Sequence, residues 1–349
     1  MRIEQDIKLD YQDVLFKPKR STLTSRKDVD LTRTFKFYNS GKEWTGVPIM
    51  SSNMDGVGTF SMAKILQEKK MITVLRKHYT LDDWKTAIGD GVKMKYLAVC
   101  TGTGVIWDKD ALDYNTMKQV LEKYPDIPFI CVDVANGYHE NYGDFIEKLR
   151  YEYQDKTIIA GNVITGEMTE ELILRGADVV KCGIGPGSVC TTRLMTGVGV
   201  PQLSGIIECA DAANGVGGHI IADGGCVHPG DVAKAFGAGA HFVMLGGMLA
   251  GHDESEGEVI NGKVQFYGMS SNAAMTKHGS RKDGYRGAEG KVVELPYKGA
   301  VNDTVTEILG GVRSAATYIG AKRIKDMPKC TTFVRVNNVV NKVYTPFEA

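Results

Sequence analysis

A repeated order of strand, glycine- or aspartate-rich loop and helix, running from residue 47 onward, constrains the fold more than any other feature. Eight short apolar runs predict buried strands, at residues 47–54, 72–76, 96–100, 129–134, 157–162, 179–184, 219–223 and 242–245. Helical segments separate these runs, and such an order requires parallel pairing through crossover connections. Eight units without a second hydrophobic cluster predict a (β/α)8 barrel, an α/β fold. A doubly wound parallel sheet is the alternative, although it usually has fewer strands.

Two helices are marked by their end residues. Pro229 stands where a first helical turn tolerates proline, and Gly237 stands near the end of the same segment. The last helix is expected to begin with Asp303 as its cap. Its apolar face is then formed at helical spacing by Val305, Ile308, Leu309, Val312, Ala316 and Ile319.

Two segments lie outside the repeat. Residues 1–46 precede it and contain a predicted hairpin around an Asn-Ser-Gly turn, which would plug the bottom of a barrel. Residues 251–298 follow the eighth strand and open with a hairpin at Asn261-Gly262. The polar stretch after that hairpin is expected to act as a mobile lid. We therefore predict one catalytic domain, residues 1–349, with these two additions.

Charge and cysteine content narrow the classes of function. The 349 residues include 42 Lys and Arg and 42 Asp and Glu, so neither nucleic acid nor an anionic membrane is an expected partner. No apolar run approaches the roughly 20 residues of a membrane span, and the N-terminus lacks the apolar region of a signal peptide. Seven cysteines without a C-x-x-C pair favour a reducing cytoplasm over zinc binding or a disulfide framework.

The loop after the sixth strand is the candidate catalytic loop. The sixth and seventh strands start at residues 179 and 219, 40 residues apart, whereas the other starts are 22 to 33 residues apart. Gly185-Pro-Gly187 stops the strand, and a thiol, Cys190, follows among hydroxyl side chains. Barrel active sites lie at the C-terminal ends of strands, so Cys190 is a candidate nucleophile. A buried structural cysteine is the alternative.

Glycine pairs follow the last two strands. Asp223-Gly-Gly225 and Gly246-Gly247 occupy the loops where barrels commonly bind phosphate through backbone N–H groups. Asp223 is then placed to accept hydrogen bonds from ribose hydroxyls. Tight turns and a helix cap are the alternative explanation. Asp133 to Gly137 and the pair Lys77-His78 belong to the same rim, but a capping Asp and a surface pair explain them nearly as well.

Taken together, the motifs resemble the IMP dehydrogenase/GMP reductase family, over essentially the whole chain. The resemblance rests on Asn53-Met-Asp55, Lys77-His-Tyr79, Asp133-Val-Ala-Asn-Gly137, Gly183-Ile-Gly-Pro-Gly-Ser-Val-Cys-Thr-Thr-Arg193, Asp223-Gly-Gly225, Gly246-Gly247, Tyr267-Gly-Met-Ser270 and Glu289-Gly290. The GMP reductases are the better match. Only residues 77–95 separate Arg76 from Tyr96, which leaves no room for a regulatory insert of the dehydrogenases, and residues 270–300 lack their long flap.

The resemblance implies NADPH-dependent reductive deamination of GMP to IMP, in purine nucleotide interconversion. Cys190 would attack C2 of guanine and release ammonia, leaving a covalent thioimidate that hydride from NADPH reduces. Thr192 and Glu289 are the residues matched to proton transfer. An IMP dehydrogenase-like enzyme without its regulatory domain and a non-catalytic purine-nucleotide-binding barrel remain the alternatives.

The resemblance also implies binding residues. Those for GMP are Ser188, Asp223, Gly224, Gly225, Gly246, Gly247, Gly268, Met269, Ser270, Arg286 and Gly290. Those for NADPH are Ser25, Arg26, Lys77, Asp133, Val134, Ala135, Ile184, Gly185, Tyr285, Arg286, Ser314, Ala315, Ala316 and Thr317. A potassium ion is expected on the carbonyl groups of Gly185, Gly187 and Cys190. Residues 314–317 would reach the cofactor of a neighbouring subunit, so a homotetramer is expected.

The chain departs from the family pattern at Gly56, Arg76, Cys182 and Gly287. Arg76 and Gly287 border the expected cofactor and lid regions, so the preference for NADPH over NADH stays open. Cys182 is either a site of oxidative pairing or a thiol buried in the core strand.

Overall fold

Eight parallel strands close into a barrel in the computed structural model, which describes residues 1–106, 111–278 and 287–336. The strands are β4 (Ile49–Ser51), β5 (Ile72–Val74), β6 (Leu97–Thr101), β7 (Phe129–Asp133), β8 (Thr157–Val163), β9 (Val179–Cys182), β10 (His219–Asp223) and β11 (Phe242–Leu245). Strand β11 pairs with both β10 and β4, which closes the sheet on itself. The predicted (β/α)8 barrel is therefore confirmed, and the open doubly wound sheet was the wrong alternative.

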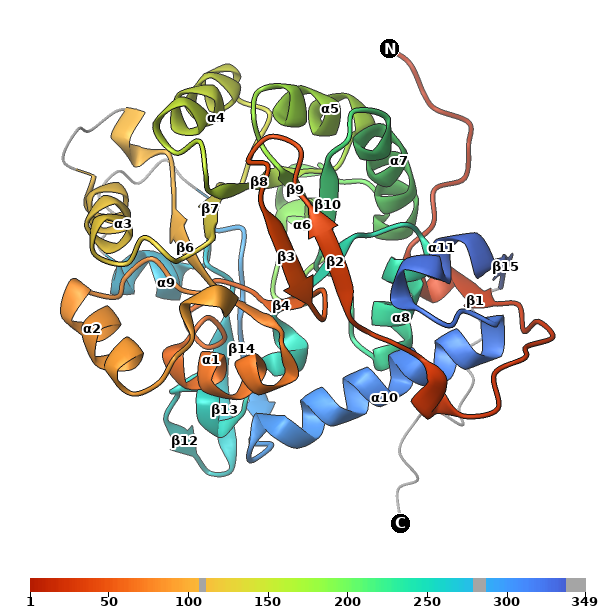
Figure 1. Ribbon diagram of the computed structural model, residues 1–349. Coiled ribbons are helices and arrows are strands. Elements are labelled where there is room, and N and C mark those ends of the chain that lie inside the picture. The colour runs from red at the N-terminus through yellow and green to blue at the C-terminus, as the bar shows by residue number, and fades with distance from the viewer. Residues whose placement is uncertain (107–110, 279–286, 337–349) are drawn as a thin grey trace.

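The major helices alternate with these strands and surround the barrel (Figure 1). They are α1 (Phe60–Leu66), α2 (Leu81–Gly89), α3 (Leu112–Lys123), α4 (Glu140–Glu152), α5 (Gly166–Leu174), α7 (Gln202–Gly215), α8 (Pro229–Gly237) and α10 (Val301–Ile319). Shorter ones are α6 (Thr192–Thr196), α9 (Asn272–Lys277), α11 (Met327–Cys330) and the 3-10 turns η1 (Tyr11–Asp13), η2 (Arg26–Asp28), η3 (Gln67–Lys69), η4 (Met94–Tyr96), η5 (Gly104–Ile106), η6 (Gly247–Leu249), η7 (Asp253–Ser255) and η8 (Ile324–Asp326). Within the described ranges, none of the helices is long and apolar enough to cross a membrane.

A hairpin covers the N-terminal end of the barrel. Strands β2 (Arg33–Lys36) and β3 (Glu43–Gly46) pair antiparallel, with Phe35 opposite Trp44. Phe35 stacks on Phe242 with ring centroids 4.2 Å apart, and Phe37 meets Phe129 edge-on at 6.0 Å. Because Phe129 and Phe242 are the first residues of their strands, these rings fill the lower end of the interior. Figure 1 shows the hairpin lying across that end.

Helix α10 begins two residues before its expected cap. Its N-cap is Ala300, and Asp303 lies in the first turn instead, so the prediction of Asp303 as the cap was wrong. The Val301 N–H instead donates to the Glu254 carboxylate at 2.8 Å. A side chain from the distant insertion thus satisfies a free N–H of the helix, which local spacing does not reveal. Helix α8 begins at Pro229 and ends at Gly237, as their positions predict.

The insertion after β11 forms an antiparallel sheet of β12 (Val259–Ile260), β13 (Lys263–Tyr267) and β14 (Val292–Pro296). Asn261 and Gly262 have φ values of 50° and 72°, the left-handed pair that a tight two-residue hairpin turn requires. Residues 279–286 of the expected lid lie outside the described residues. Near the termini, β1 (Val14–Phe16) pairs with β15 (Phe333–Arg335).

Candidate active site

The three predicted catalytic side chains lie in one hydrogen-bonded row. The Cys190 Sγ is 3.2 Å from the Thr192 Oγ1, which donates to the Glu289 Oε2 at 2.7 Å. The backbone holds this row together, because the Thr191 N–H donates to the Glu289 carbonyl at 2.9 Å. The loop after β9 and the end of the insertion are therefore joined directly, and a hydroxyl connects the sulfur to a carboxylate.

Cys190 differs in its exposure from the thiols of the barrel strands. It is half-buried in a loop, whereas Cys131 and Cys182 are buried within strands. Burial is the main cause that raises the pKa of the Cys182 thiol, and its sulfur faces Thr169 and the Val180 carbonyl. Cys182 is therefore a core thiol, the second of its two predicted explanations.

Close approaches of backbone bring the loops after β9, β10 and β11 together. A Cβ added to Gly183 would lie 2.1 Å from the Asp223 carbonyl oxygen, so only glycine fits there. A Cβ on Gly224 would lie 3.0 Å from Pro186, and one on Gly247 would lie 2.9 Å from the Ser188 Oγ. These contacts place several predicted GMP-binding residues side by side.

The insertion borders the site beside the loops after β9, β10 and β11. A Cβ on Gly268 would lie 3.1 Å from the Val189 carbonyl oxygen and 3.2 Å from the Gly290 Cα. Gly290 itself forms an antiparallel bridge with Cys190. Predicted residues of the insertion thus border the catalytic loop. Tyr285 and Arg286 lie outside the described residues.

A buried lysine, which carries no role in the sequence motifs, joins two of the predicted binding carboxylates. The Lys181 Nζ lies 2.6 Å from the Asp133 Oδ1 and 3.0 Å from the Asp223 Oδ2. The amide groups of Asn53 and Asn162 donate to Asp133 and Asp223, each at 2.9 Å. A lysine within an apolar strand was the sequence signal that could have identified this position.

Charges of this group reinforce one another. Burial tends to raise the pKa of the Asp133 carboxyl, but the ammonium groups of Lys181 and Lys77 hold it well below its usual range. Burial tends to lower the pKa of Lys181, but Asp133 and Asp223 outweigh it and raise this pKa well above its ordinary value. Lys181 and Asp133 are therefore both charged at neutral pH.

The predicted cofactor residues fall into two groups. At the rim, the Lys77 Nζ donates to the Asp133 carbonyl at 3.2 Å, and Ile184 and Gly185 follow β9. On the outside, α10 carries residues 314–317 and packs against η2, which begins at Arg26. Ala316 is fully buried, so its side chain is part of the core. Ser25 and Arg26 therefore belong to the outer group.

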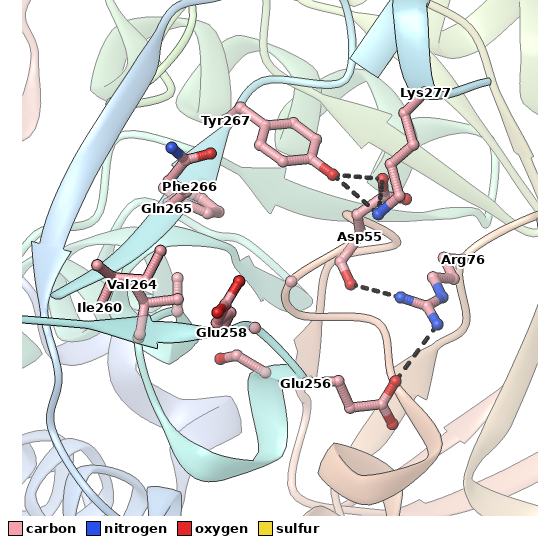
Figure 2. A pocket seen from close by; sticks show the side chains of 15 residues that line it. Asp55, Arg76, Glu256, Glu258, Ile260, Val264, Gln265, Phe266, Tyr267 and Lys277 are labelled. Atoms are coloured by element: carbon pink, nitrogen blue, oxygen red, sulfur yellow. Dashed lines mark hydrogen bonds and ion pairs between the residues drawn. The ribbon is translucent and has the colours of Figure 1, made fainter. Parts of the chain in front are cut away.

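Asp55, on the loop after β4, anchors the insertion. Its Oδ2 accepts hydrogen bonds from the Tyr267 hydroxyl at 2.8 Å and the His278 Nε2 at 2.7 Å, and the Lys277 Nζ is 3.3 Å away. Burial tends to raise the pKa of Asp55, but these hydrogen bonds lower it overall. Ligand atoms of Asp55, His78 and His278 lie within 4.8 Å of one another, yet Lys277 already supplies the positive charge there. Figure 2 shows Tyr267 and Lys277 converging on Asp55.

A cavity of about 360 Å³ lies beside this anchor, between the insertion and the rim loops (Figure 2). Arg76 lines it, with its guanidinium 3.3 Å from the Glu256 carboxylate and 3.0 Å from the Asp55 carbonyl. Cys190 does not line the cavity. Arg76, one of the departures from the family pattern, is thus fixed by the beginning of the insertion.

Comparison with known proteins shows the family of this chain. The family described as the IMP dehydrogenase / GMP reductase domain matches residues 8–342. The chain belongs to this family. Within the IMP dehydrogenase/GMP reductase family, it is 57% identical to a GMP reductase of Aliivibrio salmonicida over 350 residues and 57% identical to one of Klebsiella pneumoniae over 351 residues. A GMP reductase of Escherichia coli is 56% identical over 350 residues. Each alignment covers 99% of both chains, and the predicted family is confirmed.

Proposed function

We propose that this chain is a GMP reductase, converting GMP, NADPH and a proton into IMP, NADP⁺ and ammonia. The observation that carries this assignment is the row from the Cys190 sulfur through Thr192 to Glu289, with distances of 3.2 Å and 2.7 Å. Relatives named GMP reductases, aligned over 99% of both chains, support the same reaction. We further propose a single catalytic domain without a regulatory insert, acting in the cytoplasm.

The first half-reaction breaks the bond between C2 and the amino group of GMP. Cys190 attacks C2 as a thiolate, and its proton passes to the Thr192 oxygen as Thr192 gives its own proton to Glu289. Glu289 then returns a proton through Thr192 to the departing amino group, which leaves as ammonia. The product is a thioimidate between the Cys190 sulfur and C2, with atoms and charge balanced. Positioned proton transfer of this kind contributes about 10²- to 10⁴-fold to a rate.

The second half-reaction releases IMP and regenerates the free Cys190 thiol. When bound, NADPH supplies hydride to C2. Cys190 then leaves as a thiolate and takes up a proton, and IMP is free. The chain contributes orientation: Lys77 and Asp133 at the rim would hold the cofactor, while Ser188, Asp223 and the glycine loops would hold the nucleotide.

A potassium ion fits the donor set of the catalytic loop. The carbonyl oxygens of Gly185, Gly187 and Cys190 are ligands suited to a hard cation. Gly185 has a φ of 78°, and the Cys190 N–H donates to the Gly187 carbonyl at 3.0 Å, so the loop bends tightly around these groups. We propose that the ion would fix this bend and thereby the position of the thiol.

A homotetramer is part of the same proposal. Residues 314–317 and the turn at Arg26 lie together on the outside of the barrel, because α10 packs against η2. This outer group is suited to meet the cofactor of a neighbouring subunit. Size-exclusion chromatography with light scattering would test the assembly, and a stable, fully active monomer would contradict it.

One assay tests the proposed reaction. The full chain is mixed with GMP and NADPH in potassium buffer, and the absorbance of the reduced cofactor, IMP and ammonia are followed together. We expect equal amounts of NADPH consumed and of IMP and ammonia formed, with NADH in a parallel reaction to settle cofactor preference. NADPH formation from IMP at a steady rate would favour the dehydrogenase alternative. Binding of GMP without turnover in either direction would favour the non-catalytic one.

A further inference from the structure

We propose that Lys181 is a positioning residue that serves the GMP and NADPH sites together by holding the carboxylates of Asp133 and Asp223 in place. The inference rests on the proposed function, because it uses the assignment of Asp133 to the cofactor and Asp223 to the GMP ribose. In this proposal Lys181 contacts neither the Cys190 sulfur nor C2 of GMP.

Strand β9 directs Lys181 into the barrel. Val179, two residues earlier, packs inside the barrel with Phe129, Ile221 and Phe242. Side chains of a strand alternate between its two faces, so Lys181 lies on the same inner face. Its side chain is 3% exposed. A buried ammonium is unfavourable without anionic partners, so its two carboxylate contacts explain its presence there.

A glycine on the neighbouring strand makes these contacts possible. Gly161 of β8 is paired with Asp133 on one side and with Lys181 on the other. A Cβ at Gly161 would lie 2.6 Å from the Lys181 Cβ and 2.5 Å from its carbonyl oxygen. The missing side chain therefore leaves room for the ammonium to reach Asp133, two strands away.

The bridge controls the direction of both carboxylates. Lys181 and Asn53 bind different oxygens of Asp133, while Lys181 and Asn162 share one oxygen of Asp223. The other Asp223 oxygen is thereby left to face a ligand hydroxyl. Removing one partner from a buried ion pair is strongly unfavourable, because the remaining charge has no compensation. Loss of Lys181 would leave two partly buried carboxylates without their shared cation, and both would turn away from their present positions.

The inference predicts a specific pattern of kinetic constants. Asp223→Asn should raise mainly the KM for GMP, and Asp133→Asn mainly the KM for NADPH. Lys181→Met should raise both, each on the order of tenfold or more, since it removes the ion partner of both carboxylates. The rate at which iodoacetamide alkylates Cys190 should stay within about twofold of wild type, because the thiol is not in contact with the bridge.

A matched control separates positioning from general loss of stability. Lys156, the residue just before β8, is also buried, at 7% exposure, and its ammonium donates to the Pro125 carbonyl. Lys156→Met should lower stability and leave both KM values unchanged. Lys181→Gln, which keeps an N–H donor without the charge, provides a second variant if the Met form does not fold.

The test uses the full-length chain with steady-state kinetics and calorimetric binding of GMP. Raised KM values for both ligands in Lys181→Met or Lys181→Gln, with unchanged values in Lys156→Met, would support the inference. A folded Lys181 variant with the wild-type KM for either ligand, or with only kcat reduced, would overturn it while the proposed function stands. A wild-type chain inactive on GMP would instead overturn the proposed function and the inference with it.

Discussion

At the N-terminal end of the barrel, the rings of Phe35 and Phe242 stack 4.2 Å apart, whereas the C-terminal end holds Lys181 between two carboxylates at 2.6 Å and 3.0 Å. The same strands contribute to both ends. Along β7, the inward-facing residues change from Phe129 to Asp133 within four positions. One end of the interior is therefore apolar and the other charged.

The difference indicates that one end of the barrel mainly stabilises the fold and that the other end mainly serves binding and catalysis. Aromatic packing at the closed end contributes burial energy and needs no ligand. The charged end contains buried ions and glycines that are unfavourable for stability but provide a binding and reacting surface. Substitutions at the closed end should therefore change the free energy of unfolding, and substitutions at the open end should change binding and turnover.

Replacing the candidate nucleophile should give the largest effect. Cys190→Ser should reduce turnover of GMP by on the order of 10⁴-fold or more, since a serine hydroxyl is far less ionised than a thiol. GMP should still bind, because Asp223 and the glycine pairs that are proposed to hold its ribose and phosphate lie on other loops. Cys226→Ser alters another half-buried thiol near the same rim and should keep its activity. Retention of more than about a tenth of the activity in Cys190→Ser would remove Cys190 from this role.

Removing aromatic packing at the closed, N-terminal end of the barrel should lower the free energy of unfolding without changing activity. Phe35→Ala should lower the free energy of unfolding by about 3 to 5 kcal/mol, because this ring is 1% exposed and packed against other rings. Tyr38, in the same hairpin but 73% exposed, is the matched control, and Tyr38→Ala should change stability by less than about 1 kcal/mol. Urea denaturation measures both. A raised KM for GMP in folded Phe35→Ala would contradict the separation of the two ends.

The proton route can be tested apart from the nucleophile. Glu289→Gln should slow release of ammonia from GMP by about 10²- to 10³-fold, because Thr192 loses its carboxylate partner. The reverse reaction of IMP with NADP⁺ should still give a burst of NADPH, since hydride transfer needs chiefly cofactor geometry. Glu294→Gln, on exposed β14, should behave as wild type in both assays. If Glu289→Gln lost the burst and kept deamination, its carboxylate would belong to cofactor positioning.

Acidity should weaken the closed end by the smallest amount. Burial is the main cause that lowers the pKa of His219 to about 4, and this ring meets Phe35 edge-on. Between the ordinary value near 6.5 and about 4, the unfolded chain binds a proton that the folded chain does not. His219 alone should thus lower the free energy of unfolding by about 2 kcal/mol from pH 7 to pH 5. His219→Gln should reduce this loss, and an equal loss in the variant would assign it to other groups.

Local pattern was enough to predict the barrel, because eight apolar runs of strand length alternate with helices. It also placed Cys190, Asp133 and Asp223 on one rim, since each follows a parallel strand. Contacts over long sequence distances were not predictable from the residues alone. The path of the insertion decides that Glu254 caps α10 and that Tyr267 and His278 meet Asp55.

Lys181 shows a different limit of prediction from the sequence. Its charge within an apolar strand was visible in the sequence, but its partners depend on which strands are neighbours and on the space left by Gly161. The contact of Glu289 with Thr192 likewise needed the family resemblance, because 97 residues separate them. The roles of all these site residues in binding and catalysis stay predictions.

The covalent role of Cys190 can be tested most directly in the reverse direction. The wild-type chain is mixed with IMP and NADP⁺ without ammonia, while NADPH absorbance and the mass of the intact chain are measured. The sulfur should bond to C2 as hydride leaves, giving a burst of about one NADPH per site. The mass of the intact chain should rise by that of the bound nucleotide. Cys190→Ser should show neither the burst nor the rise in mass. Continuous NADPH formation would mean that water completes the reaction, as in a dehydrogenase, and the absence of both burst and adduct in the wild type would contradict a nucleophilic Cys190.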